Sequence, residues 1–245
     1  MIIDRLSIRK RPSGQPLMHQ KWGKLLFMHW RINPDLLRPL IPAGLAIDTF
    51  DDSAWIGIIP FTMWDIRAFP PYAPAMPGLN AMHELNVRTY VHLDGTPGVW
   101  FFSLDCTNAA AVFGARNFYY LPYYNAEITL DQSDSKIIYS SKRTDKPTAT
   151  LQTTWTIGES IPQTLPDSLE FFLTERYCLF SEHKGKLHRA RIHHQPWVLR
   201  TATVSSHSST MIQALDLAEP TDAPILNYAE EIAVDIWPLE KLRHS

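Results

Sequence analysis

The sequence has little of what would assign it to a metal-binding, disulfide-stapled, nucleotide-binding or nucleic-acid-binding class. Only two cysteines, Cys106 and Cys178, occur in 245 residues, and they form neither a disulfide framework nor a metal-site spacing. The formal net charge is −2, so no basic field attracts nucleic acid or an anionic membrane. No G-x-G-x-x-G or P-loop motif is present. We therefore expect no metal, no cofactor and no nucleic-acid partner.

Long apolar runs are also missing. The longest, WIGIIPF at residues 55–61, is far too short to span a bilayer. The N-terminal stretch MIIDRLSIRKRPSG is charged and lacks the apolar segment of a signal peptide. These features predict a protein without a membrane partner, located in the cytoplasm, and the low cysteine count fits such a compartment.

What the sequence does contain is aromatic residues and strand-like segments. Aromatic residues make up 11% of the chain and favour β-structure. Strands outnumber helices, no regular βαβ rhythm occurs, and no linker divides the chain. We predict a single domain over residues 1–245, mainly β in the α+β sense, with a closed antiparallel or mixed sheet. Helices are expected near 33–40, 108–118 and 167–177, the last with an Asp167–Glu170 capping box and as the strongest helix pattern, over residues 166–180.

The predicted strand at residues 84–91 carries two different faces. Glu84, Asn86, Arg88 and Tyr90 alternate with apolar residues and therefore share one side. This side is either a solvent-exposed face with a weak surface ion pair or the polar wall of an interior ligand site. The next strand, 99–106, is apolar on both faces, which indicates that it is covered on both sides. Its partner is then expected to be covered too, which favours the interior site.

Histidines and serines give weaker signals. His183, His188, His193 and His194 lie in or beside one predicted strand, but no carboxylate stands at a metal-ligand spacing from them. We interpret them as ordinary polar or core-edge histidines. The serine run at 205–210 lacks the glycines of a nucleophile elbow and gives little support for a hydrolase.

Several motifs in order resemble a known family. They are LLFMHWRINPDLLRPLIPAGLAIDTFDDSAWIGIIPF, HELNVRTYV, GVWFFSLDC, ARNFYYLPYYNAEI and LTERYCLF, which together span about residues 20–240. The chain resembles the YqjF-like proteins, an uncharacterised bacterial family in the acetoacetate decarboxylase-like superfamily. This resemblance implies closed or conical antiparallel sheets with two or three peripheral helices.

The resemblance also implies a site, but with altered chemistry. The decarboxylase segment reads roughly G-R-E-x-x-[GA]-[FY]-P-K-K, and its first lysine forms a Schiff base whose pKa the second lysine depresses. Here Arg116 and the proline match, Asn117 replaces the glutamate, and Tyr123 and Tyr124 replace the two lysines. Glu84 matches the active-site glutamate. A phenol forms no imine with a ketone, although it can move a proton or hydrogen-bond a carboxylate.

The position of the family's early-strand arginine falls near Gly23, with Lys21 and Lys24 close by. The resemblance thus predicts candidate catalytic residues Glu84, Arg116 and Tyr123, both Glu84 and Arg116 being buried at one interior space. It predicts candidate substrate-binding residues Arg88, Tyr90, Tyr124 and Lys24.

Three functions follow as alternatives. The first is non-covalent lyase- or isomerase-type chemistry on a small keto or carboxylate compound, without a Schiff base. The second is a non-catalytic protein that binds an apolar or aromatic small molecule, and the third is a structural domain with a filled interior, where the tyrosines are only filler. A small-molecule ligand is expected in the first two, and a homo-oligomer is compatible with all three.

Overall fold

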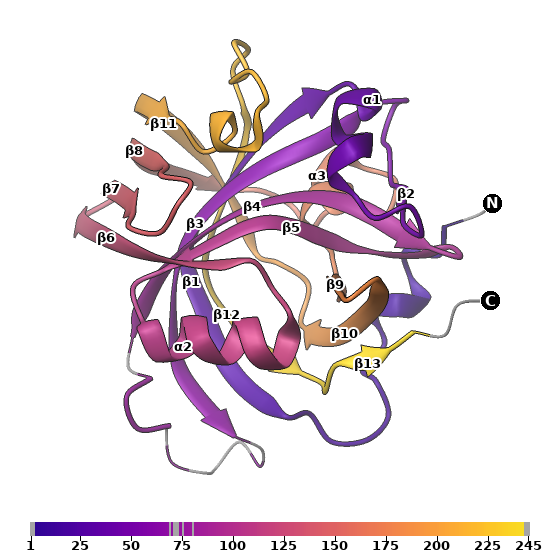
Figure 1. Cartoon of the computed structure of the whole chain (residues 1–245). Helices are drawn as coiled ribbons and strands as arrows, with labels where there is room; N and C mark the ends of the chain where they lie inside the picture. The colour runs from indigo at the N-terminus through magenta and orange to yellow at the C-terminus, as the bar shows by residue number, and fades with distance from the viewer. Residues whose placement is uncertain (1–2, 69, 71–73, 75, 80, 243–245) are drawn as a thin grey trace.

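A computed structural model describes residues 3–68, 70, 74, 76–79 and 81–242, and within them the chain is mostly strand (Figure 1). The strands are β1 (Met18–Ile32), β2 (Ala46–Ile47), β3 (Ala54–Ala68), β4 (Met82–Leu93), β5 (Thr96–Cys106), β6 (Tyr123–Ser133), β7 (Lys136–Arg143), β8 (Thr150–Ser160), β9 (Cys178–His183), β10 (Lys186–His194), β11 (Leu199–Ser209), β12 (Ile225–Ile236) and β13 (Glu240–Lys241). The helices are α1 (Pro34–Leu37), α2 (Ala109–Gly114) and α3 (Leu169–Thr174), with 3₁₀ turns at Ser7–Arg9, Arg38–Leu40 and Gln213–Leu215 and a π-helical segment at Ala115–Tyr119. The predicted mainly-β fold is confirmed.

All of these strands belong to one mixed sheet that closes on itself. Its order is β13-β10-β9-β5-β6-β7-β8-β11-β12-β1-β3-β4-β2, and the further pairings β4–β5 and β10–β12 join strands that are distant in this order. Most pairs are antiparallel, whereas β5 runs parallel to both β6 and β9. Strands β1, β3, β4, β5 and β12 are shared by the two closed circuits that result, so each of these strands has an interior on both of its faces.

Each face of the shared strands has its own hydrophobic core. Leu85, Val87 and Val91 of β4 belong to one core, while Tyr90 belongs to the other. Side chains alternate along a strand, so Glu84 shares the side of Tyr90, where it is 2% exposed. The prediction that the polar side of this strand faces the interior is confirmed for Glu84.

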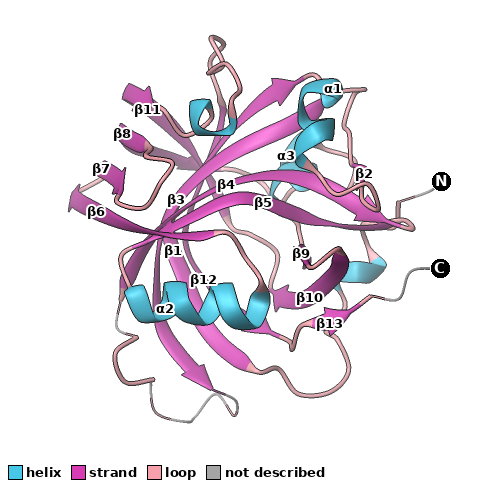
Figure 2. Cartoon of the chain, in the orientation of Figure 1, coloured by secondary structure: helices cyan, strands magenta, loops and turns pink. Residues whose placement is uncertain are grey.

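The helices are short and begin at recognisable caps. Asn33 and Asn108 accept hydrogen bonds from the first turns of α1 and α2, as their positions in the sequence suggest. Figure 2 shows α2 lying across the strands rather than inside the sheet.

The helix predicted at 167–177 is wrong in its second half. Its cap is Ser168 rather than Asp167, because Ser168 Oγ accepts from Phe171 N. The helix ends at Thr174, and Cys178 begins β9, which pairs with β10 and β5. Strand pairing over this apolar segment outweighs its helical periodicity.

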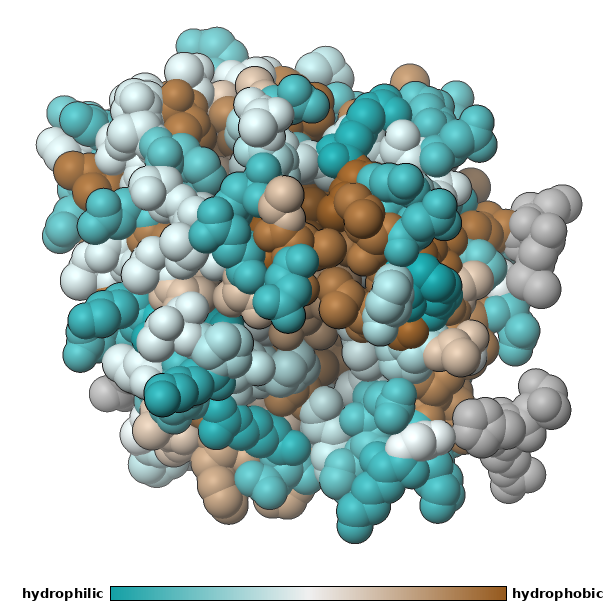
Figure 3. Space-filling model, turned by 45° about the horizontal axis from the view of Figure 1, so that its top comes forward, coloured by the Kyte–Doolittle hydropathy of each residue, from teal (hydrophilic) through white to brown (hydrophobic). Residues whose placement is uncertain are grey.

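One face of the molecule carries a hollow in which hydrophobic residues gather, with polar residues around it (Figure 3). Apolar surface of this kind is common on folded proteins and by itself identifies no partner.

In the part of the chain that the structure describes, no helix has the length and apolar character needed to cross a membrane.

Candidate functional site

A cavity of about 440 Å³ lies against the second core, between β1, β3, β4, β5 and the helix α2. Its wall is mostly apolar, with Phe27, Phe61 and Leu104 among the lining residues. At the opposite ends of its polar wall lie Glu84 and Arg88, with Asn86 between them on β4. A mostly apolar cavity with a few polar groups is the usual form of a small-molecule site.

Glu84 holds a proton at neutral pH. The pKa of its carboxyl is raised to about 8, mainly by burial; the hydrogen bond from Tyr123 opposes this effect, and the nearby Asp105 adds to it. Tyr123 Oη donates to Glu84 Oε2 at 2.9 Å, and both residues line the cavity. Burial also raises the pKa of the Tyr123 phenol well above its ordinary value. The pair is therefore neutral and can exchange protons with a bound molecule.

Arg88 is a cation without a carboxylate partner among the described residues. Its Nη2 donates to the Leu173 carbonyl at 3.3 Å and lies 3.4 Å from Tyr90 Oη, while its Nε is buried without a partner. The guanidinium stacks over Phe27 and Tyr90, at 5.5 and 5.7 Å from the ring centroids. Arg88 is half-buried and lines the cavity, and a cation withdrawn from water is stabilised by a counterion, so this part of the wall is suited to an anion.

A second guanidinium lines the same end of the cavity and has a carboxylate partner. Arg176 Nη1 donates to Asp48 Oδ2 at 2.6 Å, and Asp48 also pairs with Arg5. Arg176 stacks over the ring of Tyr90 at 4.5 Å, so the two lining arginines share one aromatic neighbour. No sequence motif indicated a role for Arg176, because it reaches the site only when the segment between α3 and β9 packs against β4.

Some of the buried polar atoms without a partner lie on residues that line this cavity. Among the lining residues of the described chain, buried side-chain atoms without a partner occur on Gln20, Trp22, Asn86, Arg88 and Arg176. Native proteins pair the great majority of their buried polar groups. Water or a bound molecule in the cavity would satisfy these atoms.

Several predicted site residues lie elsewhere. Arg116 is exposed rather than buried, with 42% of its side chain accessible, and it lies outside the cavity wall. Tyr90 and Lys24 are also outside the wall. Tyr90 Oη donates to the Leu173 carbonyl at 2.6 Å and contacts His29. The same hydroxyl accepts from Arg88 Nη2 at 3.4 Å, so Tyr90 helps to position the Arg88 guanidinium. The predicted common interior space therefore includes Glu84, Tyr123 and Arg88 but excludes Arg116.

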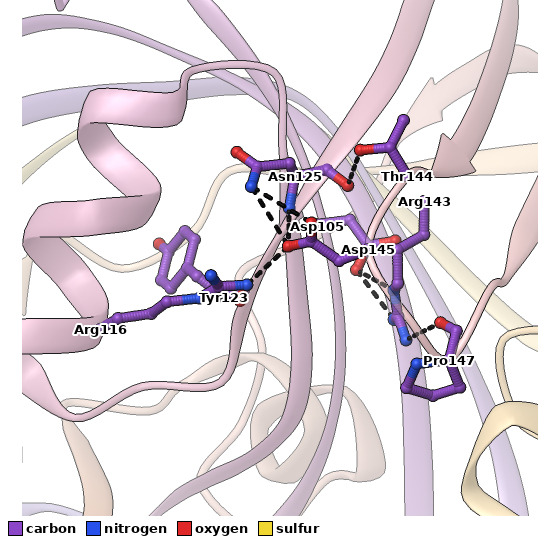
Figure 4. A network of polar contacts seen from close by, with 8 residues as sticks. All are labelled: Asp105, Arg116, Tyr123, Asn125, Arg143, Thr144, Asp145 and Pro147. Atoms are coloured by element: carbon purple, nitrogen blue, oxygen red, sulfur yellow. Dashed lines mark hydrogen bonds and ion pairs between the residues drawn. The ribbon is translucent and has the colours of Figure 1, made fainter.

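Arg116 instead holds the backbone of the strand that carries Tyr123 (Figure 4). Its Nε donates to the Tyr123 carbonyl at 2.7 Å, and its Nη2 donates to Asp145 Oδ2 at 2.6 Å. Asp145 in turn accepts from the Asn125 amide at 3.0 Å. This clamp fixes residues 123–125 and so sets where the Tyr123 hydroxyl meets Glu84.

Tyr124 points away from the cavity, toward a buried ion pair on the other side of the sheet. Its ring lies 4.1 Å from the Arg143 guanidinium carbon, and Arg143 Nε donates to Asp105 Oδ1 at 2.9 Å. The two adjacent tyrosines thus differ: Tyr123 joins the cavity and Tyr124 joins the packing behind it.

His194 is a lining residue that the sequence analysis treated as ordinary. Its Nδ1 lies 2.7 Å from the Gln195 carbonyl and its Nε2 lies 3.3 Å from the Arg176 carbonyl. Burial lowers the pKa of His194 from its ordinary value, and the two carbonyl contacts oppose this effect. The described residues contain no group of histidine, cysteine and carboxylate side chains arranged to hold a metal ion.

Tyr123→Phe is expected to raise the pKa of the Glu84 carboxyl above that of the unmodified protein. The phenol stabilises the ionised carboxylate by donating to it, and its removal leaves burial unopposed. The carboxyl carbon resonance of Glu84, followed by NMR against pH, measures the shift. Tyr124→Phe is the matched control and should leave the titration unchanged; equal shifts in both variants would contradict the assignment of the hydrogen bond.

Comparison with known proteins identifies the family of this chain. Residues 19–233 match the model of DUF2071, described as an uncharacterized conserved protein. The chain is 39% identical over 230 residues to the uncharacterized protein YqjF of Bacillus subtilis (strain 168), covering 94% of each chain.

Solved structures with the same fold share little sequence. The enduracididine biosynthesis enzyme MppR in complex with pyruvate aligns with a TM-score of 0.64 at 11% identity, covering 94% of this chain and 91% of MppR. Acetoacetate decarboxylase from Legionella pneumophila aligns with a TM-score of 0.61 at 13% identity, covering 95% and 88%. The fold is therefore acetoacetate decarboxylase-like, and the chain belongs to the DUF2071 family.

Proposed function

We propose that this protein binds a small organic acid in its interior cavity and carries out acid–base chemistry on it without a covalent intermediate. The observation that carries the proposal is that a protonated carboxyl and a guanidinium without a carboxylate partner face the same apolar cavity. Glu84 holds a proton, and Arg88 lacks a carboxylate partner among the described residues. The acid's carboxylate would pair with Arg88, and Glu84 with Tyr123 would donate or accept a proton at an oxygen or carbon farther along the molecule.

The fold neighbours give this proposal a chemical context. MppR holds pyruvate, a keto acid, and the other neighbour is a decarboxylase of acetoacetate. At such low sequence identity the structural similarity shows only a shared fold, so the proposal depends on the residues of this chain. A 440 Å³ cavity argues against a filled interior. Among the described residues Glu84 pairs with Tyr123 and with no arginine, which favours a working acid over a residue that only forms a binding wall.

Binding is tested with Arg88→Met, which keeps the length of the side chain and removes its charge. Isothermal titration with carboxylates should show binding to the unmodified protein and at least a tenfold loss in the variant, because the ligand's charge would lose its counterion. Arg31→Met is the control, since Arg31 is half exposed, pairs with Asp51 and lies outside the cavity. Equal affinity in all three proteins would overturn the proposal.

Catalysis and binding alone are then separated by Glu84→Gln. A general acid or base that is replaced by an amide costs roughly 10²–10⁴-fold in rate. A binding protein would change only in affinity. Once a turned-over acid is found, a rate in the variant within threefold of the original would favour the binding-only alternative.

No Schiff base is expected with a keto acid. No lysine lines the cavity within the described residues, and Lys24 stands outside its wall. Incubation with acetoacetate and borohydride should leave the intact mass unchanged, because a solvated lysine stays protonated near neutral pH and is a poor nucleophile. A stable mass increase that maps to Lys24 or to another lysine would contradict the non-covalent part of the proposal.

A further inference from the structure

We infer that the acid bound here is a monocarboxylate with a long apolar body, of the size of octanoate or a phenyl-substituted alkanoate, and not a short keto acid. This inference rests on the proposed function and adds the size and charge class of the ligand. Three independent features of the cavity carry it: its volume, the separation of its polar ends and its charge balance.

The volume is larger than a short acid needs. A protein cavity of about 150 Å³ is sufficient to hold one benzene molecule. The cavity here is about 440 Å³. A ligand with four carbons would leave most of the apolar wall facing empty space or water, and that wall includes Phe61, Phe101 and Leu104. Methylene or ring carbons of a ligand that fill this space would pack against the apolar wall and displace water from it, which is favourable.

The polar ends are too far apart for a short acid to reach both. Glu84 and Arg88 are four residues apart on β4, so their Cα atoms are separated by about 13 Å. Arg88 reaches toward Tyr90 and the Leu173 carbonyl, which lie farther along the strand direction from Glu84. A molecule whose carboxylate pairs with Arg88 therefore needs several carbons before it contacts Glu84.

The charge balance at the two ends of the cavity favours a ligand with one carboxylate. At one end, Arg176 shares Asp48 with Arg5, and Arg88 has no carboxylate partner among the described residues, so the cations there outnumber the carboxylates. At the other end, Glu84 is neutral at pH 7 and offers a hydrogen bond instead of a cation. A second carboxylate at that end would be buried without a counterion, which is costly.

The chain-length dependence of binding tests the inference in the unmodified protein. Acetate, butyrate, hexanoate and octanoate are titrated calorimetrically at pH 7. Each added methylene that enters the cavity should tighten binding about fourfold, so octanoate, with four more methylenes, should bind about 250-fold more tightly than butyrate. Octanol, which has the same body without the charge, should bind more weakly than octanoate.

The outcomes separate this inference from the proposed function. Butyrate and octanoate that bind within threefold of each other, both with a loss in Arg88→Met, would overturn the size class and leave the proposed function standing. No binding by any acid would overturn the proposed function. Octanoate binding that persists in Arg88→Met would show adsorption to apolar surface outside this site and would overturn both.

A lining substitution tests the location. Ala111 faces the cavity from α2, whereas Ala109 on the same helix is exposed and outside the wall. Ala111→Phe should weaken octanoate at least tenfold and leave butyrate within threefold, because the new ring occupies space that only the longer body uses. Ala109→Phe should change neither, and equal losses for both acids in Ala111→Phe would contradict the inference.

Discussion

Glu84→Gln is expected to make the folded protein more stable than the original at high pH, by a few kcal/mol at pH 9. The carboxyl has an ordinary pKa of 4.5 in the unfolded chain and a pKa of about 8 in the folded one. Between these values the folded chain keeps a proton that the unfolded chain releases, so the free energy of unfolding falls as pH rises. A glutamine keeps the acceptor for Tyr123 and has no proton to lose.

The pH dependence of this difference is its signature. The two proteins should have nearly equal stability at pH 4.5 and below, diverge from there to about pH 8, and differ by a constant amount above. The raised pKa of Asp105, about 6, acts in both proteins and cancels. Urea unfolding at pH 5, 7 and 9 measures the stability difference between Glu84→Gln and the original protein.

Glu127→Gln is the control, because Glu127 is exposed on β6 and its replacement should produce no pH-dependent difference. A constant difference between Glu84→Gln and the original protein across all three pH values would show that Glu84 ionises normally. The acid of the proposed site would then be absent.

Asp48→Asn is expected to destabilise the protein by about 3–5 kcal/mol at pH 7, the second large effect. Asp48 is fully buried and receives Arg176 at 2.6 Å, with the partly exposed Arg5 on its other oxygen. Removal of the charge leaves the Arg176 guanidinium buried without a counterion, which costs far more than the pair itself contributes. Urea unfolding with a constant m-value would measure the loss.

The matched control is an exposed ion pair. Glu240 meets Arg189 at 3.0 Å, but 57% of the Glu240 side chain is accessible. Glu240→Gln should change stability by no more than about 1 kcal/mol, because water screens such a pair. Similar losses in Asp48→Asn and Glu240→Gln would mean that the buried arginine finds another partner, and the charge balance described for the cavity would be wrong.

Alternation along β4 could be read correctly from the sequence because it depends on local geometry. Side chains at every second position share a side whatever the rest of the fold does. The doubly apolar strand at 99–106 then indicated that its neighbour is covered, and Glu84 is buried as this reasoning requires. The resemblance predicted both Tyr123 and Glu84 as candidate catalytic residues, and the two are hydrogen-bonded.

The errors have a different origin. Arg116 matches a family motif, but it lies in a π-helical segment just before Tyr120, whose φ is +54°, and its side chain turns outward to Asp145. A motif match fixes a position in the chain and not the direction of a side chain. The segment after Thr174 kept its helical spacing in the sequence, yet its pairing with β10 made it a strand.

Arg176 and His194 carried no local signal for a site. Both enter the cavity wall because β9 and β10 pair with β5 and β12, which are distant in the sequence. Contacts of this kind follow from the closure of the sheet. A single sequence without its fold contains no spacing that would reveal them.

A crystal structure with 8-bromooctanoate tests the central claim most directly, because the bromine locates the far end of the acid by its anomalous signal. We expect the carboxylate within hydrogen-bond distance of the Arg88 guanidinium and the bromine inside the apolar cavity, toward Glu84 and Tyr123. A bromine signal outside the cavity, or an unoccupied cavity in crystals that hold the acid elsewhere, would contradict the account.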